Sequence, residues 1–200
     1  MKLNFISGYD ALQFIEEKIA SKKTYVISGI DNGAKKIGLA RFISVTGNVV
    51  PYGALYNNNE VSQKITHFIK ESMPICCVIG VWCPNDDNTD NTVRLHSKIS
   101  WKQLPEMTKK LLCDMQKLSC DAEELNALYS STENLYTMNK QHHDSINVTF
   151  FDESMTTVLA NHKLKDVGLC RKKRILLDDQ IAAMELLERF VSFFKLRSKV

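Results

Sequence analysis

The sequence of 200 residues lacks any long uninterrupted run of apolar residues. A membrane-spanning helix needs about 20 such residues, and Lys, Glu or Gly interrupts every apolar stretch much sooner. The N-terminal segment also lacks the apolar centre of a signal peptide, because Asp10, Glu16 and Glu17 lie where that centre would be. We therefore expect no membrane span and no export, and the predicted location is the cytoplasm.

The sequence also lacks cysteines at the spacing that metal sites use. The six cysteines contain no Cys-x-x-Cys spacing, which is common in structural zinc sites. Disulfides are rare in the cytosol. We expect reduced thiols that neither bind zinc nor cross-link the chain.

A strong net charge is also absent. The formal charge is +3, which by itself is too small to indicate a polyanionic partner. The charge is unevenly distributed. Residues 161–200 contain 10 Lys or Arg and 5 Asp or Glu, whereas residues 1–160 contain 16 Lys or Arg and 18 Asp or Glu. The basic excess therefore lies in the last fifth of the chain.

What is present is an average globular composition, with 44% hydrophobic and 24% charged residues. This excludes disordered, collagen-like and disulfide-scaffold proteins and predicts one domain with a sizeable core. Hydrophobic periodicity alternates between strand and helix along the chain, which indicates an α/β fold. The predicted strands are 25–30, 36–45, 49–56, 75–81 and 148–151. The predicted helices are 11–20, 59–72, stretches within 92–128, 156–167 and 176–194.

Acidic residues stand where these apolar elements end or begin. Asp31 follows the first strand, Asp152 and Glu153 follow the last strand, and Asp178 and Asp179 are predicted in the first turn of the final helix. Strand carboxyl ends meet at one edge of such a sheet, which is where α/β proteins place their sites. Clustered carboxylates repel one another unless they are protonated or neutralised by a cation. Mg²⁺ suits such oxygen ligands, and two ions can promote phosphodiester hydrolysis.

Three motifs around these acids resemble those of a known family. Residues 29–40 (GIDNGAKKIGLA) are similar to the Gly-Ile-Asp-x-Gly-x-Lys-Arg-Ile-Gly-x-Ala opening of the YqgF/RuvX proteins. Residues 151–157 (FDESMTT) resemble their Asp-Glu-Arg-x-Thr-Thr, and residues 177–183 (LDDQIAA) resemble their Asp-x-x-Ala-Ala. This family is RNase H-like. Its members are known as Holliday junction resolvases and are now regarded as pre-16S rRNA nucleases.

The resemblance implies a mixed five-stranded RNase H-like sheet, with a three-strand antiparallel meander and two parallel strands, flanked by helices. This nuclease domain would span 25–200, with an insertion at about 95–147 and an N-terminal helical extension at 1–24. Position by position, Asp31, Glu153 and Asp179 would be the catalytic ligands of Mg²⁺ or Mn²⁺. Whether Asp178 or Asp152 shares in metal binding stays open.

The family glycines have physical roles in this interpretation. Gly33 is expected to take a left-handed turn after Asp31, and Gly38 is expected to let backbone or metal approach the neighbouring strand. One departure concerns a cation: Ser154 stands where the family has Arg, which removes a partner for phosphate or carboxylate.

Basic residues near the motifs are the predicted nucleic-acid contacts. They are Lys35, Lys36, Arg171, Lys172, Lys173 and Arg174. Such residues bind phosphates without reading the sequence of bases.

The predicted function is metal-dependent phosphodiester hydrolysis at the 5′ end of pre-16S rRNA, with RNA favoured over DNA. A four-way DNA junction resolvase and a non-catalytic nucleic-acid-binding module remain alternatives. A sugar-kinase or actin-like ATPase shares the Asp-x-Gly opening but needs a second domain, for which 200 residues leave no room. The stripe Leu104, Met107, Leu111 and Met115 is interpreted as core packing, with a homodimer contact as the other possibility.

Overall fold

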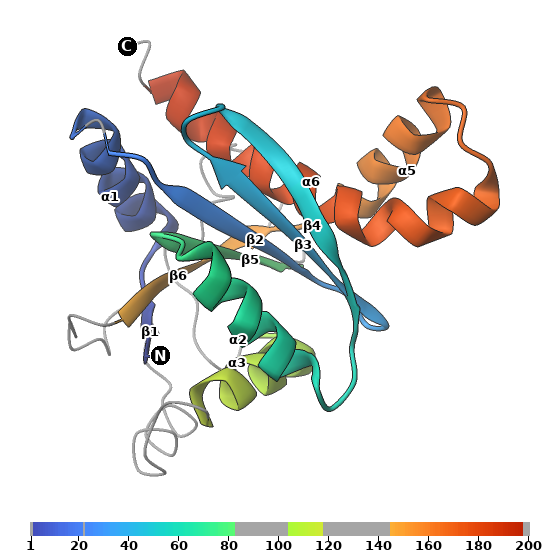
Figure 1. Cartoon of the computed structure of the whole chain (residues 1–200), viewed down its shortest axis with the longest axis horizontal. Helices are drawn as coiled ribbons and strands as arrows, with labels where there is room; N and C mark the ends of the chain where they lie inside the picture. Colours follow the sequence, from blue (N-terminus) through green and yellow to red (C-terminus); the bar gives the residue numbers. More distant parts are fainter. Residues whose placement is uncertain (1, 22, 83–103, 118–144, 198–200) are drawn as a thin grey trace, which may run out of the picture.

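The computed structural model describes residues 2–21, 23–82, 104–117 and 145–197, which form one six-stranded sheet with helices on both faces (Figure 1). The strands are β1 (Lys2–Phe5), β2 (Val26–Asn32), β3 (Lys36–Ile43), β4 (Asn48–Tyr56), β5 (Cys76–Val81) and β6 (Ser145–Asp152). The helices are α1 (Gly8–Ala20), α2 (Val61–Ser72), α3 (Glu106–Lys117), α5 (Thr156–Asp166) and α6 (Arg171–Arg197).

The strand order is β1-β6-β5-β2-β3-β4. Strands β2, β3 and β4 form an antiparallel meander, and β5 and β6 run parallel to β2. This confirms the predicted α/β class and the mixed sheet with an antiparallel meander, although the sheet has six strands in place of the five expected. The carboxyl ends of β2, β5 and β6 consequently lie at the same edge.

The sixth strand, β1, was not predicted, because only a helix was expected before residue 24. It pairs parallel to β6, and Leu3 and Phe5 are buried on one face of the sheet. The Phe5 ring stacks on Phe150 with 6.0 Å between ring centroids. Two apolar residues in a four-residue strand are too few to produce a recognisable periodicity. The expected helix is present as α1, and its N-terminal cap is Ser7, whose Oγ accepts from the backbone N–H of Asp10 at 3.1 Å.

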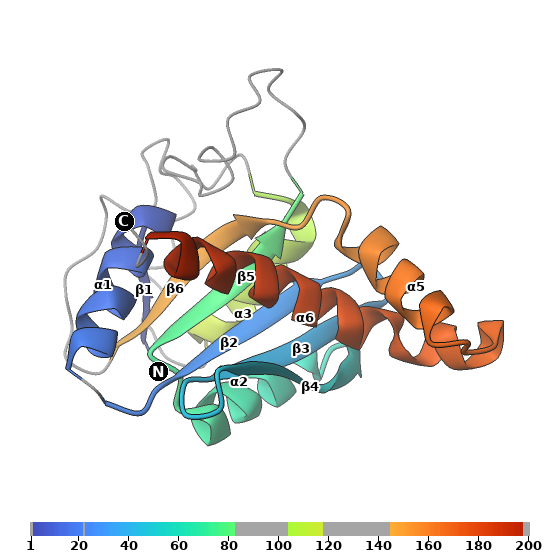
Figure 2. The ribbon, with the colours of Figure 1, turned by 90° about the horizontal axis from the view of Figure 1, so that it is seen from above.

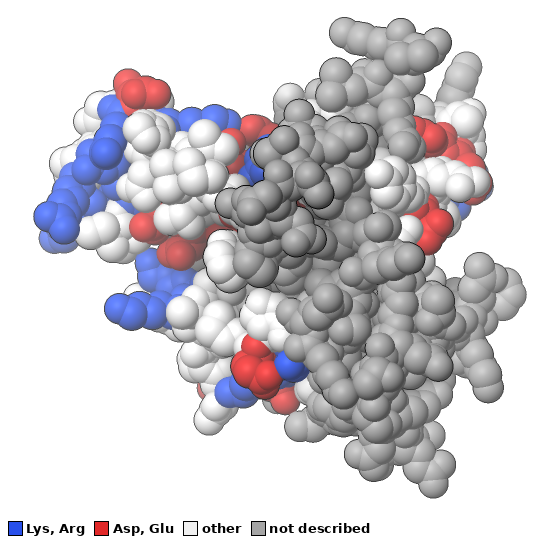
Figure 3. Space-filling model, turned by 180° about the vertical axis from the view of Figure 1, so that it is seen from behind, with Lys and Arg blue, Asp and Glu red and all other residues white. Residues whose placement is uncertain are grey.

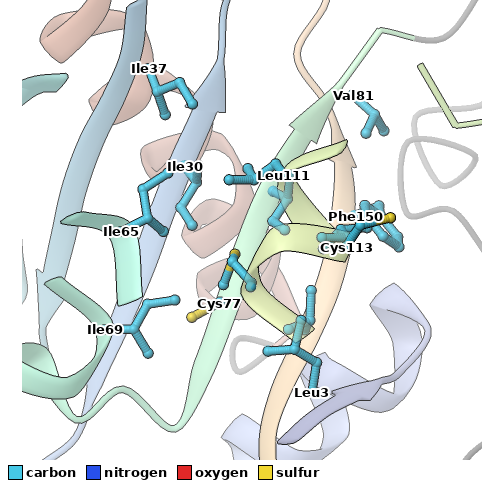
Figure 4. Close-up of a cluster of buried hydrophobic side chains, with 14 of the residues drawn as sticks. Leu3, Ile30, Ile37, Ile65, Ile69, Cys77, Val81, Leu111, Cys113 and Phe150 are labelled. Atoms are coloured by element: carbon cyan, nitrogen blue, oxygen red, sulfur yellow. The ribbon is translucent and has the colours of Figure 1, made fainter. Parts of the chain in front are cut away.

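Each face of the sheet carries its own apolar core. Helices α2 and α3 cover one face, and α1 and α6 cover the other (Figure 2). In the first core, shown in Figure 4, Leu111 of α3 packs with Ile30 and Ile65. Leu104 and Met115 are buried there too. Three of the four stripe residues therefore pack in the core, as predicted, and Met107 is half-buried.

Helix α6 begins earlier than its periodicity indicated. The predicted start was residue 176, whereas the helix starts at Arg171 and its first turn is the basic run. Four cations oppose the helix dipole at this end, but Lys and Arg are good helix formers. Asp178 and Asp179 consequently lie beyond the first turn, which corrects the prediction that placed them within it.

Small residues let α6 lie directly on the sheet. A Cβ added to Gly38 of β3 would collide with the backbone carbonyl of Asp179 and lie 3.1 Å from Ala183 Cβ. A Cβ added to Gly29 of β2 would lie 3.1 Å from Leu187 Cβ. The expected close approach at Gly38 is confirmed, and the approaching group is the α6 backbone. The expected left-handed turn at Gly33 is wrong, because its φ is not positive. A side chain is excluded there by the carbonyl oxygen of Lys36, 2.6 Å from an added Cβ.

Much of the predicted insertion at 95–147 lies outside the described residues, apart from Leu104 to α3 and the start of β6. The boundaries at 24 and 25 stay predictions. None of the helices in the described part of the chain has both the length and the apolar character needed to cross a bilayer.

Replacing Gly38 by Ala should destabilise the fold by about 3 kcal/mol, the upper end of overpacking effects, because backbone stands where the methyl group would go. Gly53→Ala in the adjacent strand is the matched control, since an added Cβ meets nothing within 4 Å there. It should stay within about 0.5 kcal/mol of the wild type. Chemical denaturation measures both, and equal effects of the two substitutions would contradict the role given to Gly38.

Candidate active site

Carboxyl groups converge on the α6 face at the edge where the parallel strands end. Asp31 is the penultimate residue of β2, Glu153 directly follows β6, and Asp179 is carried by α6. The backbone N–H of Glu153 donates to the carbonyl of Val81 at 3.1 Å, which holds the end of β6 against the end of β5. The fold thus gathers three acids that are more than 100 residues apart at their extremes.

Asp31 and Glu153 form a buried, mutually hydrogen-bonded pair. Burial raises the pKa of Asp31 to about 6, helped by the charge of Asp179 and opposed by the hydrogen bond with Glu153. Burial also raises the pKa of Glu153 to about 8, and the charge of Asp31, the hydrogen bond with it and the charge of Asp152 act in the same direction. Two acids this close cannot both ionise easily, so one proton is shared between them.

One oxygen of this pair has no donor. Glu153 Oε2 is buried without a hydrogen-bond partner in the described part of the chain. Gly80 of β5 makes room for it, since a Cβ added there would lie 2.6 Å from Oε2. After Glu153 the chain turns into α5 through Met155, whose backbone is left-handed with φ 70°. An unpartnered buried acceptor beside a second carboxyl is an arrangement that a cation would stabilise.

Asp179 is held by an ion pair. Lys36 Nζ lies 3.1 Å from Asp179 Oδ2 and donates to the carbonyl of Ile175 at 3.1 Å. The hydrogen bond to Asp179 raises the pKa of Lys36. Burial and the charge of Asp179 raise the pKa of neighbouring Asp178. Lys36 was predicted to contact phosphate, and in this structure it neutralises the third acid.

The donor set partly fits the metal that the resemblance implies. Among the described residues, no three His, Cys, Asp or Glu side chains are arranged closely enough to hold an ion. Asp31 and Glu153 nevertheless offer buried carboxylate oxygens of the kind that Mg²⁺ and Mn²⁺ prefer, and Glu153 Oε2 is unpartnered. The charge of Asp179 acts on Asp31. Asp179 could join them if its carboxylate were released by Lys36.

Asp152 has a structural role at the end of β6. Its Oδ1 accepts from the backbone N–H and the hydroxyl of Ser154, at 2.9 and 2.5 Å. Arg189 of α6 donates to the carbonyl of Ser154 at 2.7 Å and lies 3.8 Å from Asp152 Oδ2. Arg189 therefore places a guanidinium beside the position where the family has Arg. It was not predicted, because inside a helix it resembles any partly exposed cation.

The predicted phosphate contacts lie in two places. Lys35 is exposed in the turn between β2 and β3. Arg171, Lys172 and Lys173 are exposed on an arm made of α5 and the beginning of α6, residues 156–176, which projects beyond the sheet (Figures 1 and 2). Figure 3 shows Lys and Arg side chains gathered at the outer end of this arm. Arg174 differs, because its Nη1 donates to the carbonyl of Leu169 at 3.0 Å.

Glu153→Gln should stabilise the metal-free protein in a pH-dependent manner. The pKa of Glu153 is raised from 4.5 to about 8 on folding, so wild-type stability falls as pH rises through this range. We expect Gln to add about 1–3 kcal/mol at pH 9, the range for an unsatisfied buried group, and little near pH 5. Denaturation in chelator-containing buffers tests this.

The exposed Glu17→Gln serves as the control for this pH dependence and should be neutral throughout. A gain in stability by Glu153→Gln that did not vary with pH, or a loss at pH 9, would contradict the shared-proton interpretation.

A comparison with protein families agrees with the second and third motifs, and the first motif lies outside the matched residues. The model of the RuvX family, described as Holliday junction resolvase, matches residues 118–192, which include Glu153 and Asp179. No curated protein matches the chain. Two solved structures of Thermus thermophilus RuvC, one in complex with Holliday junction substrate, align over 84% of this chain and 96% of theirs. Their sequence identities are 12% and 10%, and their TM-scores are 0.41 and 0.37. The family match supports a nuclease of the Holliday junction resolvase type, and it confirms that this chain resembles the YqgF/RuvX family.

Proposed function

We propose that the protein is a metal-dependent nuclease that hydrolyses phosphodiester bonds at the sheet edge that carries the Asp31–Glu153 pair, with Asp179 nearby on α6. The observation that carries this proposal is the buried Asp31–Glu153 pair, with its raised pKa values and the unpartnered Glu153 Oε2. A buried carboxyl pair is unfavourable for a purely structural purpose. It is well suited to an ion that neutralises both groups.

Asp31 and Glu153 would hold Mg²⁺ or Mn²⁺, with Asp179 as the third ligand. When bound, the ions lower the pKa of water and neutralise charge on the leaving oxygen. The protein's own groups prepare this site: burial keeps Asp31 and Glu153 together, and the Asp179 backbone packed on Gly38 holds the third carboxylate nearby. Lys36 holds Asp179 in an ion pair and provides a cation for an incoming phosphate once the ion pair opens.

The α5–α6 arm would guide the polyanion toward this site. Lys172 precedes Asp179 by seven residues, so it lies on nearly the same face of α6, about 10 Å along the helix axis. A phosphate backbone that passes Asp179 can therefore reach Lys172 and its exposed neighbours Arg171 and Lys173. Such contacts supply affinity through counterion release. Lys35 would contribute from the β2–β3 turn.

The substrate we infer is RNA, at the 5′ end of pre-16S rRNA, as the YqgF/RuvX resemblance implies. The second candidate is four-way DNA, because the matching family is described as Holliday junction resolvase. A third is a non-catalytic binding module, since Ser154 replaces the family Arg and its hydroxyl is bound to Asp152. A cytoplasmic location and a homodimer remain predictions.

Asp31→Asn should lower cleavage by about 100-fold or more, because loss of even outer partners of metal ligands lowers affinity or activity about 10–100-fold. The assay presents precursor rRNA and four-way DNA in competition, with Mg²⁺, Mn²⁺ or chelator. Glu17→Gln on the exposed side of α1, away from the arm, is the control and should retain full activity. Undiminished cleavage by Asp31→Asn would refute the assignment. Binding without cleavage by the wild type would favour the non-catalytic module.

The double substitution Lys172→Ala and Lys173→Ala should weaken nucleic-acid binding for every base sequence and reduce the salt slope of log K by about 1–2 units. The control is Lys70→Ala, an exposed lysine of α2 on the opposite face of the sheet. Binding titrations over a range of salt concentrations measure the slope. An unchanged salt slope in the double variant would show that the arm does not take part in nucleic-acid binding.

A further inference from the structure

Two exposed aromatic side chains stand at the edge of the sheet that carries the acids. Trp82 is 62% exposed and directly follows β5, and Tyr56 is 71% exposed at the end of β4. Single exposed apolar residues are common and need no explanation. A pair that brackets a cluster of buried carboxyls is different, because it gives one active edge two flat apolar surfaces.

Trp82 lies beside Glu153. The preceding residue, Val81, accepts the backbone N–H of Glu153 at 3.1 Å and pairs in register with Asp152. Gly80, two residues before Trp82, provides the space that Glu153 Oε2 occupies. The indole is therefore attached to the strand end that positions one member of the buried acid pair.

Tyr56 lies on the other side of the site. It is the cross-strand partner of Lys36, so both side chains stand on the same face of the sheet. Lys36 in turn binds Asp179 at 3.1 Å. The phenol ring is thus placed next to the ion pair that involves the third acid.

The strand order sets the separation between the two rings. Strands β5, β2, β3 and β4 are consecutive, so the backbones at Trp82 and Tyr56 are three strand spacings apart, about 14 Å. Asp31 and Lys36 lie on the two strands between them. A nucleic-acid strand running along this edge would place a phosphate at the acids and a base at each ring.

We infer that Trp82 and Tyr56 are stacking platforms for unpaired bases on the two sides of the bond that is cleaved, which makes single-stranded or locally unpaired nucleic acid the substrate class. This inference rests on the proposed nuclease function. Every base has a π-face, so stacking on aromatic rings is tolerant of base sequence and contributes about 1–3 kcal/mol per base. Bases within an intact duplex are already stacked and paired, and are not available to such rings.

The test measures binding in the cleavage-deficient Asp31→Asn background with Mg²⁺, so that the probe stays intact. The probe is a short fluorescent RNA, presented as a single strand or annealed to its complement. Trp82→Ala and Tyr56→Ala should each weaken single-strand binding about 5- to 150-fold, which corresponds to the stacking energy, and leave duplex binding within about twofold. Trp82→Phe should restore most of the affinity. Val45→Ala, exposed in the β3–β4 turn at the opposite edge, is the control and should change neither.

A second readout reports stacking directly. The chain has two tryptophans, so Trp101→Phe leaves Trp82 as the only one. Single-stranded RNA should then quench its fluorescence, and duplex RNA should quench it much less.

Each failure has its own meaning. If the parent protein binds neither form of RNA nor the corresponding DNA, the proposed function falls and the inference falls with it. If the parent binds but both alanine variants bind equally well, or lose single-strand and duplex binding alike, the inference alone is overturned. A change in oligomeric state in Trp82→Ala on size-exclusion chromatography, with binding unchanged, would assign the exposed indole to self-association and also overturn it.

Discussion

The site depends on one contact, the close packing of α6 on the glycines of the sheet. At Gly38 the backbone of Asp179 occupies the space of the missing side chain, and Ala183 continues the contact. This approach places the Asp179 carboxylate within reach of Lys36 and within the electrostatic influence of Asp31. A helix lifted by one side chain would separate the third acid from the other two. The glycine and alanine positions of the motifs thus set the distance between α6 and the sheet. The position of Asp179 relative to Asp31 and Glu153 depends on that distance.

Electrostatics explains why this arrangement suits a functional site better than a structural one. Asp31 and Glu153 are buried together and retain a proton that exposed carboxyls would release. Among the described residues no hydrogen-bond donor contacts Glu153 Oε2, although such a donor would offset the free-energy cost of burying this oxygen. Asp179 is stabilised by Lys36, with the two side chains 28% and 20% exposed, so this pair can rearrange at modest free energy. The edge therefore combines a fixed acid pair with an exchangeable third carboxylate.

The elements with strong periodicity were predicted from the sequence, and the errors are physical ones. Strand β1 escaped detection because four residues carry no reliable pattern, and its stability comes from Phe5 packing on Phe150. The start of α6 was placed too late because its first turn is basic and polar, whereas the periodic signal begins only with the apolar residues. Gly33 was predicted to adopt a left-handed backbone conformation, but its φ is not positive. A glycine is needed there because the carbonyl oxygen of Lys36 leaves no room for a side chain.

The sequence by itself predicted which acids form the candidate site, because the motifs around Asp31, Glu153 and Asp179 have a recognisable order and spacing. It also determined the α/β class, since strand and helix periodicities alternate clearly along the chain, and the mixed sheet was implied by the family resemblance. Only the tertiary structure decided the state of these acids. It joined Asp31 to Glu153 and paired Asp179 with Lys36, and it brought Arg189 to the end of β6. Burial and partners arise from residues far apart in the chain, and the pKa of a side chain depends on those surroundings.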